Sequence, residues 1–288
     1  MRCLGNNVKI AANNLTVCYN DEGPDNAPVI IFIHGFPLNK SMWDWQVEAL
    51  KDNYRVLAYD IRGHGNSGEG TEDFTIDLFT TDLIGLMDTL KIKTAMLCGL
   101  SMGGYVALNA IEKYPDRFDA LILSDTQCTA DSPEAKEKRT KSIENINENG
   151  VSKYADSGII NLFAPESLIA NAEAIIAVRE MILNTSKQSL IKTLGALSLR
   201  NETCSKLPEI AVPVLILVGK EDKITPPEAS LFMHKKIHKS RMYVLDHCGH
   251  LSNMENHAAF NAHLREFTDR VTNKNAALKN LMTFELIQ

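Results

Sequence analysis

Residues 95–104 read AMLCGLSMGG, a short apolar run that turns at once into a glycine-rich stretch around Ser101. The turn fits the pattern G-x-S-x-G, and the residues after it have helical spacing. A serine on a sharp strand-to-helix turn needs small neighbours where the backbones approach closely, and Gly99, Gly103 and Gly104 supply them. The stretch therefore predicts an exposed nucleophile at Ser101.

Strands and helices alternate along most of the chain. Continuous β-branched runs such as VIIFI at 29–33 and VLILV at 214–218 indicate strands buried on both faces. The predicted strands are 8–10 and 15–19, which form a hairpin, then 29–33, 55–59, 95–98, 121–123, 214–218 and 242–245; the predicted helices are 41–50, 74–90, 102–114, one that begins near 226, and 256–270. This order predicts an α/β fold with a mostly parallel sheet and helices on both faces.

The alternation stops between residues 126 and 208, which contain helical stretches and no strong strand. We call residues 126–208 the helical insert and expect the core to comprise residues 1–125 and 209–288. Within the insert, the charged residues 134–141 are interpreted as a solvated helix face. The residues after Asn273 show no clear pattern and are expected to form a tail.

Composition narrows the class of protein. The 288 residues carry a formal net charge of −6, which disfavours nucleic acid and anionic membranes as partners. No apolar run is long enough to span a bilayer, and the first residues do not resemble a secretory signal. The cysteines form no C-x-x-C pair, so we expect reduced thiols, no metal site and a cytoplasmic location; they are Cys3, Cys18, Cys98, Cys128, Cys204 and Cys248.

A nucleophilic serine needs a base whose pKa lies near neutral pH, and histidine meets this need. His250 lies five residues beyond the last predicted strand, in a loop that can bring its side chain over the strand ends. We take His250 as the base for Ser101 and His247 as its nearby rival.

The imidazole in turn needs a carboxylate that holds its tautomer. Asp222 follows the predicted strand 214–218, at the carboxyl end where the active-site loops of a parallel sheet gather. We take Asp222 as this acid. Glu221 is adjacent, and Asp125, after an earlier strand, is the alternative.

Attack on a carbonyl creates an oxyanion that needs preorganised donors. The backbone amides of Phe36, after the strand 29–33, and of Met102, at a helix N-terminus, are the candidates. His34 is interpreted as a supporting residue. The loop 60–67, DIRGHGNS, is interpreted as a structural loop with an internal salt bridge rather than a metal site.

Five motifs occur in a fixed order along the chain: HGFP, DIRGHGNS, GLSMGG, GKEDKITP and CGHLSNME. In order and context they resemble the α/β-hydrolase superfamily over residues 8–270, with Ser101, Asp222 and His250 as nucleophile, acid and base. The resemblance implies that the helical insert is a cap before the penultimate strand, with the site between cap and sheet. The GLSMGG turn and the SDT sequence at the end of the LILS strand, residues 124–126, are similar to those of small carboxylesterases and 3-oxoadipate enol-lactonases.

The resemblance implies a serine hydrolase, without a cofactor, that acts on a small-molecule ester or lactone. Leu162 and Phe163 are expected to join Ile224 and Leu251 around an apolar pocket, and a place in the hydrophobic core is the equal alternative for each of them. Two alternatives stay open: a carbon–carbon hydrolase or haloperoxidase-like perhydrolase with the same triad, and a ligand-binding receptor without catalysis. The sequence does not predict the oligomeric state.

Overall fold

The computed structural model describes residues 5–285, with side chains described as far as residue 273. Within this part of the chain, eight strands form one sheet in the order β1-β2-β4-β3-β5-β6-β7-β8. β2 pairs antiparallel with β1 and β4, and the other neighbours run parallel. The predicted N-terminal hairpin and mostly parallel sheet are therefore confirmed.

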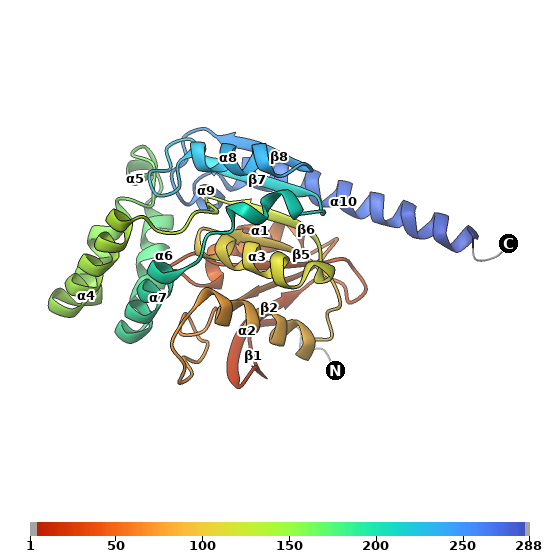
Figure 1. Cartoon of the computed structure of the whole chain (residues 1–288). Coiled ribbons are helices and arrows are strands. Elements are labelled where there is room, and N and C mark those ends of the chain that lie inside the picture. Colours follow the sequence, from red (N-terminus) through yellow and green to blue (C-terminus); the bar gives the residue numbers. More distant parts are fainter. Residues whose placement is uncertain (1–4, 286–288) are drawn as a thin grey trace.

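The elements follow the predicted alternation (Figure 1). The strands are β1 (Gly5–Ala12), β2 (Leu15–Glu22), β3 (Val29–Ile33), β4 (Arg55–Tyr59), β5 (Ala95–Leu100), β6 (Phe118–Ser124), β7 (Val214–Gly219) and β8 (Ser240–Leu245). The α-helices are α1 (Asp44–Leu50), α2 (Ile76–Thr89), α3 (Met102–Lys113), α4 (Pro133–Ile159), α5 (Ser167–Ala170), α6 (Ala172–Leu183), α7 (Lys187–Leu199), α8 (Pro227–Lys236), α9 (Ser252–Glu255) and α10 (His257–Glu285). Short 3-10 helices are η1 (Lys40–Trp43), η2 (Pro115–Arg117) and η3 (Cys204–Glu209).

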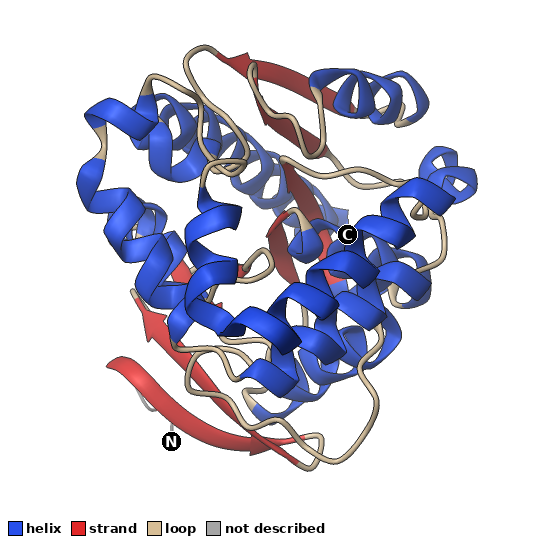
Figure 2. Ribbon diagram, turned by 90° about the vertical axis from the view of Figure 1, so that its left-hand side faces the viewer, coloured by secondary structure: helices blue, strands red, loops and turns tan. Residues whose placement is uncertain are grey.

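The central strands are buried on both faces, which explains their uninterrupted apolar sequences. Successive side chains of a strand point to opposite faces. Ile31 and Ile33 pack with α2 and α3 in one core, whereas Ile30 and Phe32 pack with α1 and α10 in another. Figure 2 shows helices around the strands, as a parallel sheet requires.

Side-chain caps start several helices. The hydroxyl of Thr75 accepts a hydrogen bond from the amide of Leu78 at the start of α2. The hydroxyls of Ser132 and Ser186 accept in the same way at the starts of α4 and α7. These bonds satisfy amides that have no partner within their own helix, so each cap sets a helix start.

The helical insert lies between β6 and β7, and α4 to α7 extend to one side of the sheet (Figure 1). The long helix α4 changes direction at Gly150, which has a φ of 80°. Ile146 of α4 packs against Leu190 and Leu194 of α7. The division of the chain into a core and a separate cap domain stays a prediction.

The final helix is longer than predicted. α10 continues to Glu285 and projects beyond the body of the protein (Figure 1), so residues 274–285 form a helical tail and the predicted helix end at residue 270 is wrong. Helix-forming residues such as Ala276, Ala277 and Leu278 account for the extension without an apolar periodicity. No helix in the described residues, α10 included, combines the length and the apolar character needed to cross a membrane.

The expectation of reduced thiols is wrong for two of the cysteines. Cys128 and Cys204 form a disulfide between residues 76 positions apart in the sequence. Cys128 follows β6 and Cys204 begins η3 before β7, so the bond joins the two ends of the helical insert. No local spacing signals such a pair, because adjacency of β6 and β7 brings the ends together. Cys18, Cys98 and Cys248 are free and buried.

We expect this disulfide to stabilise the fold. Closing a loop of this length restricts the unfolded chain, and removing such a bond costs about 2–4 kcal/mol of unfolding free energy. Denaturant unfolding of the oxidised protein should therefore have a higher midpoint than that of Cys128→Ala/Cys204→Ala. A dithiol reductant should lower the wild-type midpoint and leave the double variant unchanged; equal wild-type midpoints with and without reductant would contradict the prediction.

Candidate active site

Ser101 lies in the sharp turn between β5 and α3. Its backbone has a φ of 53° and a ψ of −114°, a strained conformation for a residue with a side chain. The turn tolerates only glycine on either side: a Cβ on Gly99 would lie 2.2 Å from the carbonyl oxygen of Gly103, and one on Gly103 would lie 2.1 Å from that of Ile33. Close packing of backbones thus holds the hydroxyl at the strand end.

The His250 imidazole is hydrogen-bonded to Asp222. The distance from Nδ1 to Oδ2 is 2.8 Å, and both side chains are buried. Asp222 also accepts bonds from the amides of Ile224 and Thr225 and from the Thr225 hydroxyl, at 2.8, 3.1 and 2.8 Å. The loops after β7 and β8 therefore hold a carboxylate–imidazole pair in a defined geometry.

The charge of Asp222 determines the proton affinity of His250. Burial by itself lowers the pKa of His250, but attraction and hydrogen bonding by Asp222, with a contribution from Asp125, raise it above its usual value. Burial also opposes ionisation of Asp222, yet His250 and the hydroxyl and amide donors keep the pKa of this carboxyl below its usual value. The pair thus favours a charged imidazole next to a charged carboxylate.

The alternative residues have other partners. Asp125 accepts hydrogen bonds from the Gly219 amide at 2.8 Å and from the hydroxyls of Ser124 and Ser252, so it joins β6, β7 and α9. His247 is exposed and contacts Glu166, with 2.8 Å between Nδ1 and Oε2. The geometry favours Asp222 and His250 over these rivals.

Ser101 and His250 line one cavity of about 750 Å³. Within the described residues, no hydrogen bond joins the Ser101 hydroxyl to the imidazole. Catalytic hydrogen bonds in unliganded sites are often long and shorten when substrate binds. The structure therefore places Ser101 on the same cavity as His250, which is bonded to Asp222.

The two candidate oxyanion donors lie on the same cavity. Phe36 and Met102 both line it, one in the loop after β3 and the other at the N-terminus of α3. Among the described residues, no acceptor is bonded to either backbone amide. Free amides beside the nucleophile are the arrangement that a tetrahedral intermediate requires.

His34 has a structural environment. Its Nε2 accepts a hydrogen bond from the Ile61 amide at 2.9 Å, and its Nδ1 lies 3.0 Å from the Gly35 carbonyl oxygen. Burial lowers the pKa of His34 to about 4. A neutral imidazole bonded to the backbone on both sides holds the loop that carries Phe36.

The loop 60–67 has ion pairs that differ from the predicted one. Asp60 forms an ion pair with Lys40, with 2.9 Å between Oδ2 and Nζ. Arg62 forms one with Asp82, with 2.6 Å between Nε and Oδ2. The prediction of a salt bridge inside the loop is wrong, because both charges reach neighbouring elements. Both pairs are buried, so they attach the loop to η1 and α2.

The cavity wall differs in part from the sequence-based expectation. Leu162 and Ile224 line it, whereas Phe163 and Leu251 pack in the core instead. Most side chains of residues 134–141 are exposed, as expected of a solvated helix face, and Lys138, Arg139 and Lys141 also line the cavity. Sequence spacing showed that these residues form a helix and could not show which side of it faces the site.

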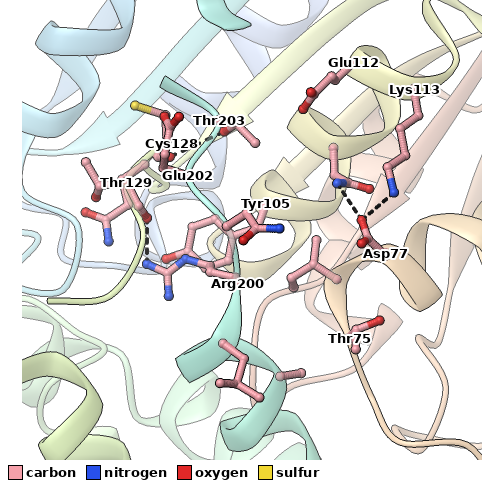
Figure 3. A pocket seen from close by; sticks show the side chains of 16 residues that line it. Thr75, Asp77, Tyr105, Glu112, Lys113, Cys128, Thr129, Arg200, Glu202 and Thr203 are labelled. Carbon is pink, nitrogen blue, oxygen red and sulfur yellow. Dashed lines mark hydrogen bonds and ion pairs between the residues drawn. The ribbon is translucent and has the colours of Figure 1, made fainter. Parts of the chain in front are cut away.

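A second cavity of about 370 Å³ lies at the base of the helical insert (Figure 3). It shares Tyr105 and Gln127 with the larger cavity. Arg200 is buried, lies 4.3 Å from the Tyr105 ring centroid and donates a hydrogen bond to the Thr129 carbonyl oxygen at 2.9 Å. Cys128 of the disulfide also lines it. Tyr105 and Gln127 therefore form a common wall between the site and the base of the insert.

Comparison with known proteins gives a consistent result. The profile of the family described as serine aminopeptidase, S33, matches residues 24–257. 3-Oxoadipate enol-lactonase 2 of Acinetobacter baylyi is 29% identical over 88% of this chain and 92% of its own. A thermophilic esterase from Thermogutta terrifontis, solved with malate bound, is 34% identical with a TM-score of 0.87, over 92% of this chain and 98% of its own. The enol-lactonase of Burkholderia xenovorans LB400 is 30% identical with a TM-score of 0.85, over 91% of this chain and 100% of its own.

We expect the pH dependence of the activity to reflect the Asp222–His250 pair. The imidazole accepts a proton only when neutral, so kcat/KM falls as the pH drops through the pKa of His250. Because that pKa is raised, the midpoint of the acid limb should lie above about 6.5, the usual value for histidine. Asp222→Asn should lower kcat by about 10⁴-fold and move the midpoint down.

The measurement is the pH profile of kcat/KM for a neutral ester. Glu221→Gln is the matched control, since Glu221 precedes Asp222 in the same loop without a bond to His250. This variant should keep the wild-type profile. A wild-type midpoint below 6.5, or an Asp222→Asn enzyme with wild-type kcat, would contradict the assignment.

Proposed function

The chain belongs to the serine aminopeptidase S33 family within the α/β-hydrolase superfamily, and from this membership we propose that it cleaves a small carboxylic ester or lactone through an acyl-serine intermediate. Membership makes the chain a hydrolase. The observation that carries the finer proposal is the buried hydrogen bond between His250 and Asp222 on the cavity that Ser101 also lines.

In the first half of the reaction, the Ser101 oxygen attacks the carbonyl carbon and its proton passes to Nε2 of His250. Asp222 stabilises the resulting imidazolium through Nδ1. The amides of Phe36 and Met102 donate to the oxyanion. When the carbon–oxygen bond breaks, the same proton moves to the leaving oxygen, and the acyl group stays on Ser101.

In the second half, water gives a proton to His250 and its oxygen attacks the acyl-serine. Collapse of this intermediate returns the proton to Ser101 and releases the carboxylic acid. With a lactone substrate, the alcohol stays attached to the acyl chain and leaves in the same product. Both halves use only the residues named, so the proposal requires no cofactor.

The cavity supports a small-molecule substrate. Its volume of about 750 Å³ lies within the range of small-molecule sites. The strained turn at Ser101 and the free amides beside it favour catalysis over the receptor alternative, because ligand binding alone needs neither. Carbon–carbon cleavage and perhydrolysis would use the same residues, so ratios of kcat/KM for esters, lactones and diketones distinguish them.

Replacement of the nucleophile tests the mechanism. Ser101→Ala should lower turnover of 4-nitrophenyl acetate by several orders of magnitude, on the order of 10⁴-fold or more, because no acyl-enzyme can form. A fluorophosphonate probe should label the wild-type protein and not this variant. Ser205→Ala, at an exposed serine, is the control and should retain both properties. Labelling or wild-type turnover in Ser101→Ala would refute the proposed mechanism.

A further inference from the structure

A half-buried carboxylate that the mechanism does not use lies close to the proposed base. Glu255 is the last residue of α9, which follows the loop that carries His250. Its Oε1 accepts a hydrogen bond from the Gly249 amide at 2.8 Å and a longer one from the Leu251 amide at 3.3 Å. These two amides flank His250 in the chain, so one oxygen of Glu255 holds the backbone on both sides of the base.

The other oxygen of Glu255 binds the helical insert. Oε2 accepts a hydrogen bond from the Ala164 amide at 2.7 Å. The side chain of Ser167, the first residue of α5, also donates to this carboxylate. Residues 164 and 167 belong to the insert, so a single carboxylate joins the insert to the loop of the base.

Backbone packing brings the same two segments into contact. The His250 amide donates a hydrogen bond to the Leu162 carbonyl oxygen at 2.9 Å. A Cβ on Gly249 would lie 2.6 Å from the Ala164 nitrogen, so the two backbones approach too closely for a side chain at this position. Leu162 also lines the cavity that Ser101 lines. The position of the base and the position of this part of the cavity wall therefore depend on the same contacts.

The bonds to Glu255 match an ionised carboxylate. Every donor is an N–H or an O–H group, and a carboxylate is the form of this side chain that only accepts. Burial raises the pKa of Glu255 above its usual value, and the donors of Ala164, Ser167, Gly249 and Leu251 oppose this increase. A glutamine is not equivalent, because its NH₂ group would face an amide N–H on one of the two sides.

The negative charge of Glu255 also acts on the imidazole. Burial opposes protonation of His250, but the carboxylates of Asp222, Asp125 and Glu255 together raise its pKa above the usual value. Asp222 bonds to the ring itself, whereas Glu255 bonds to the backbone around it. Glu255 therefore contributes in two separable ways, through its charge and through the bonds that it accepts.

We propose that Glu255 is a positioning residue for the reaction, which fixes the base relative to the helical insert by accepting bonds from the loop of His250 on one oxygen and from the insert on the other. The inference rests on the proposed function, since it concerns the base of that site. Glu255 is not among the described residues that line the cavity, so it acts through the backbone of residues 249–251 rather than on the substrate.

Two substitutions separate the bonds from the charge. Glu255→Gln removes the charge and the bonds on one side, whereas Glu255→Asp keeps the charge on a side chain too short to reach both sides. We expect kcat for 4-nitrophenyl acetate to fall by about tenfold to a hundredfold in Glu255→Gln and by less in Glu255→Asp, with little change in KM, because a displaced base slows proton transfer. Expressing kcat per active site titrated with a fluorophosphonate excludes unfolded protein from the comparison.

The pH profile of kcat/KM is the second readout. Loss of the charge should move the midpoint of the acid limb down in Glu255→Gln, because this charge raises the pKa of His250. Glu255→Asp keeps the charge and should stay close to the wild-type midpoint. A residue that only stabilised the fold would change neither this midpoint nor kcat per active site.

Glu166→Gln is the matched control. Glu166 is an exposed residue of the insert next to Ser167, and its carboxylate contacts His247 rather than the backbone around His250. This variant loses the same charge from the same region and should keep the wild-type kcat and midpoint.

The outcomes separate the two proposals. Wild-type kcat per active site and a wild-type midpoint in Glu255→Gln would overturn the positioning role, with the hydrolase mechanism intact. If Glu255→Gln does not fold, Glu255→Asp decides, because wild-type kcat per active site in that variant would overturn the role as well. Absence of Ser101-dependent turnover in the protein with Glu255 in place would overturn the proposed function and this inference with it.

Discussion

A buried hydrogen bond of 2.8 Å between Asp222 and His250 ties the end of the sheet together. It joins the loops after β7 and β8, which are parallel neighbours, so the order of strands brings two distant segments within reach. The cost of burying a carboxylate is offset by three further donors from the same loop. Asp125, at the end of β6, accepts bonds from the Gly219 amide of β7 and from the Ser252 hydroxyl of α9, so a second buried carboxylate at the ends of these strands also has its donors.

The helical insert completes the site from the other side. Its two ends are fastened by the Cys128–Cys204 disulfide, by the Thr203 amide to the Cys128 carbonyl, and by Arg200 to Thr129. Arg200 also pairs with Asp131, which is the partner of Arg139 on the cavity wall. The base of the insert is therefore connected through these contacts to the wall of the larger cavity, and Tyr105 lies between the two cavities.

Local signals were sufficient for the strands and for the turn around Ser101. A β-branched run such as VIIFI is buried on both faces in a parallel sheet. The glycines around the turn are required because a Cβ at Gly99 or Gly103 would lie only about 2 Å from a backbone carbonyl oxygen. Local sequence signals did not predict the Cys128–Cys204 disulfide or the partners of Asp60 and Arg62. They also did not show whether Phe163 and Leu251 line the cavity or pack in the core. Each of these features depends on which element, distant in the sequence, packs against the residue in the folded protein. The spacing of residues along the chain does not specify that element.

The sequence by itself determined the fold class and the strand–helix order and indicated three candidate site residues, because periodicity and turn chemistry act over a few residues. Only the tertiary structure decided that Asp222 rather than Asp125 bonds His250, that His247 faces Glu166 on the surface, and that the cationic side of α4 faces the site. The physical reason is that a helix sequence defines which side is apolar, whereas the elements packed against that side define where the polar side points.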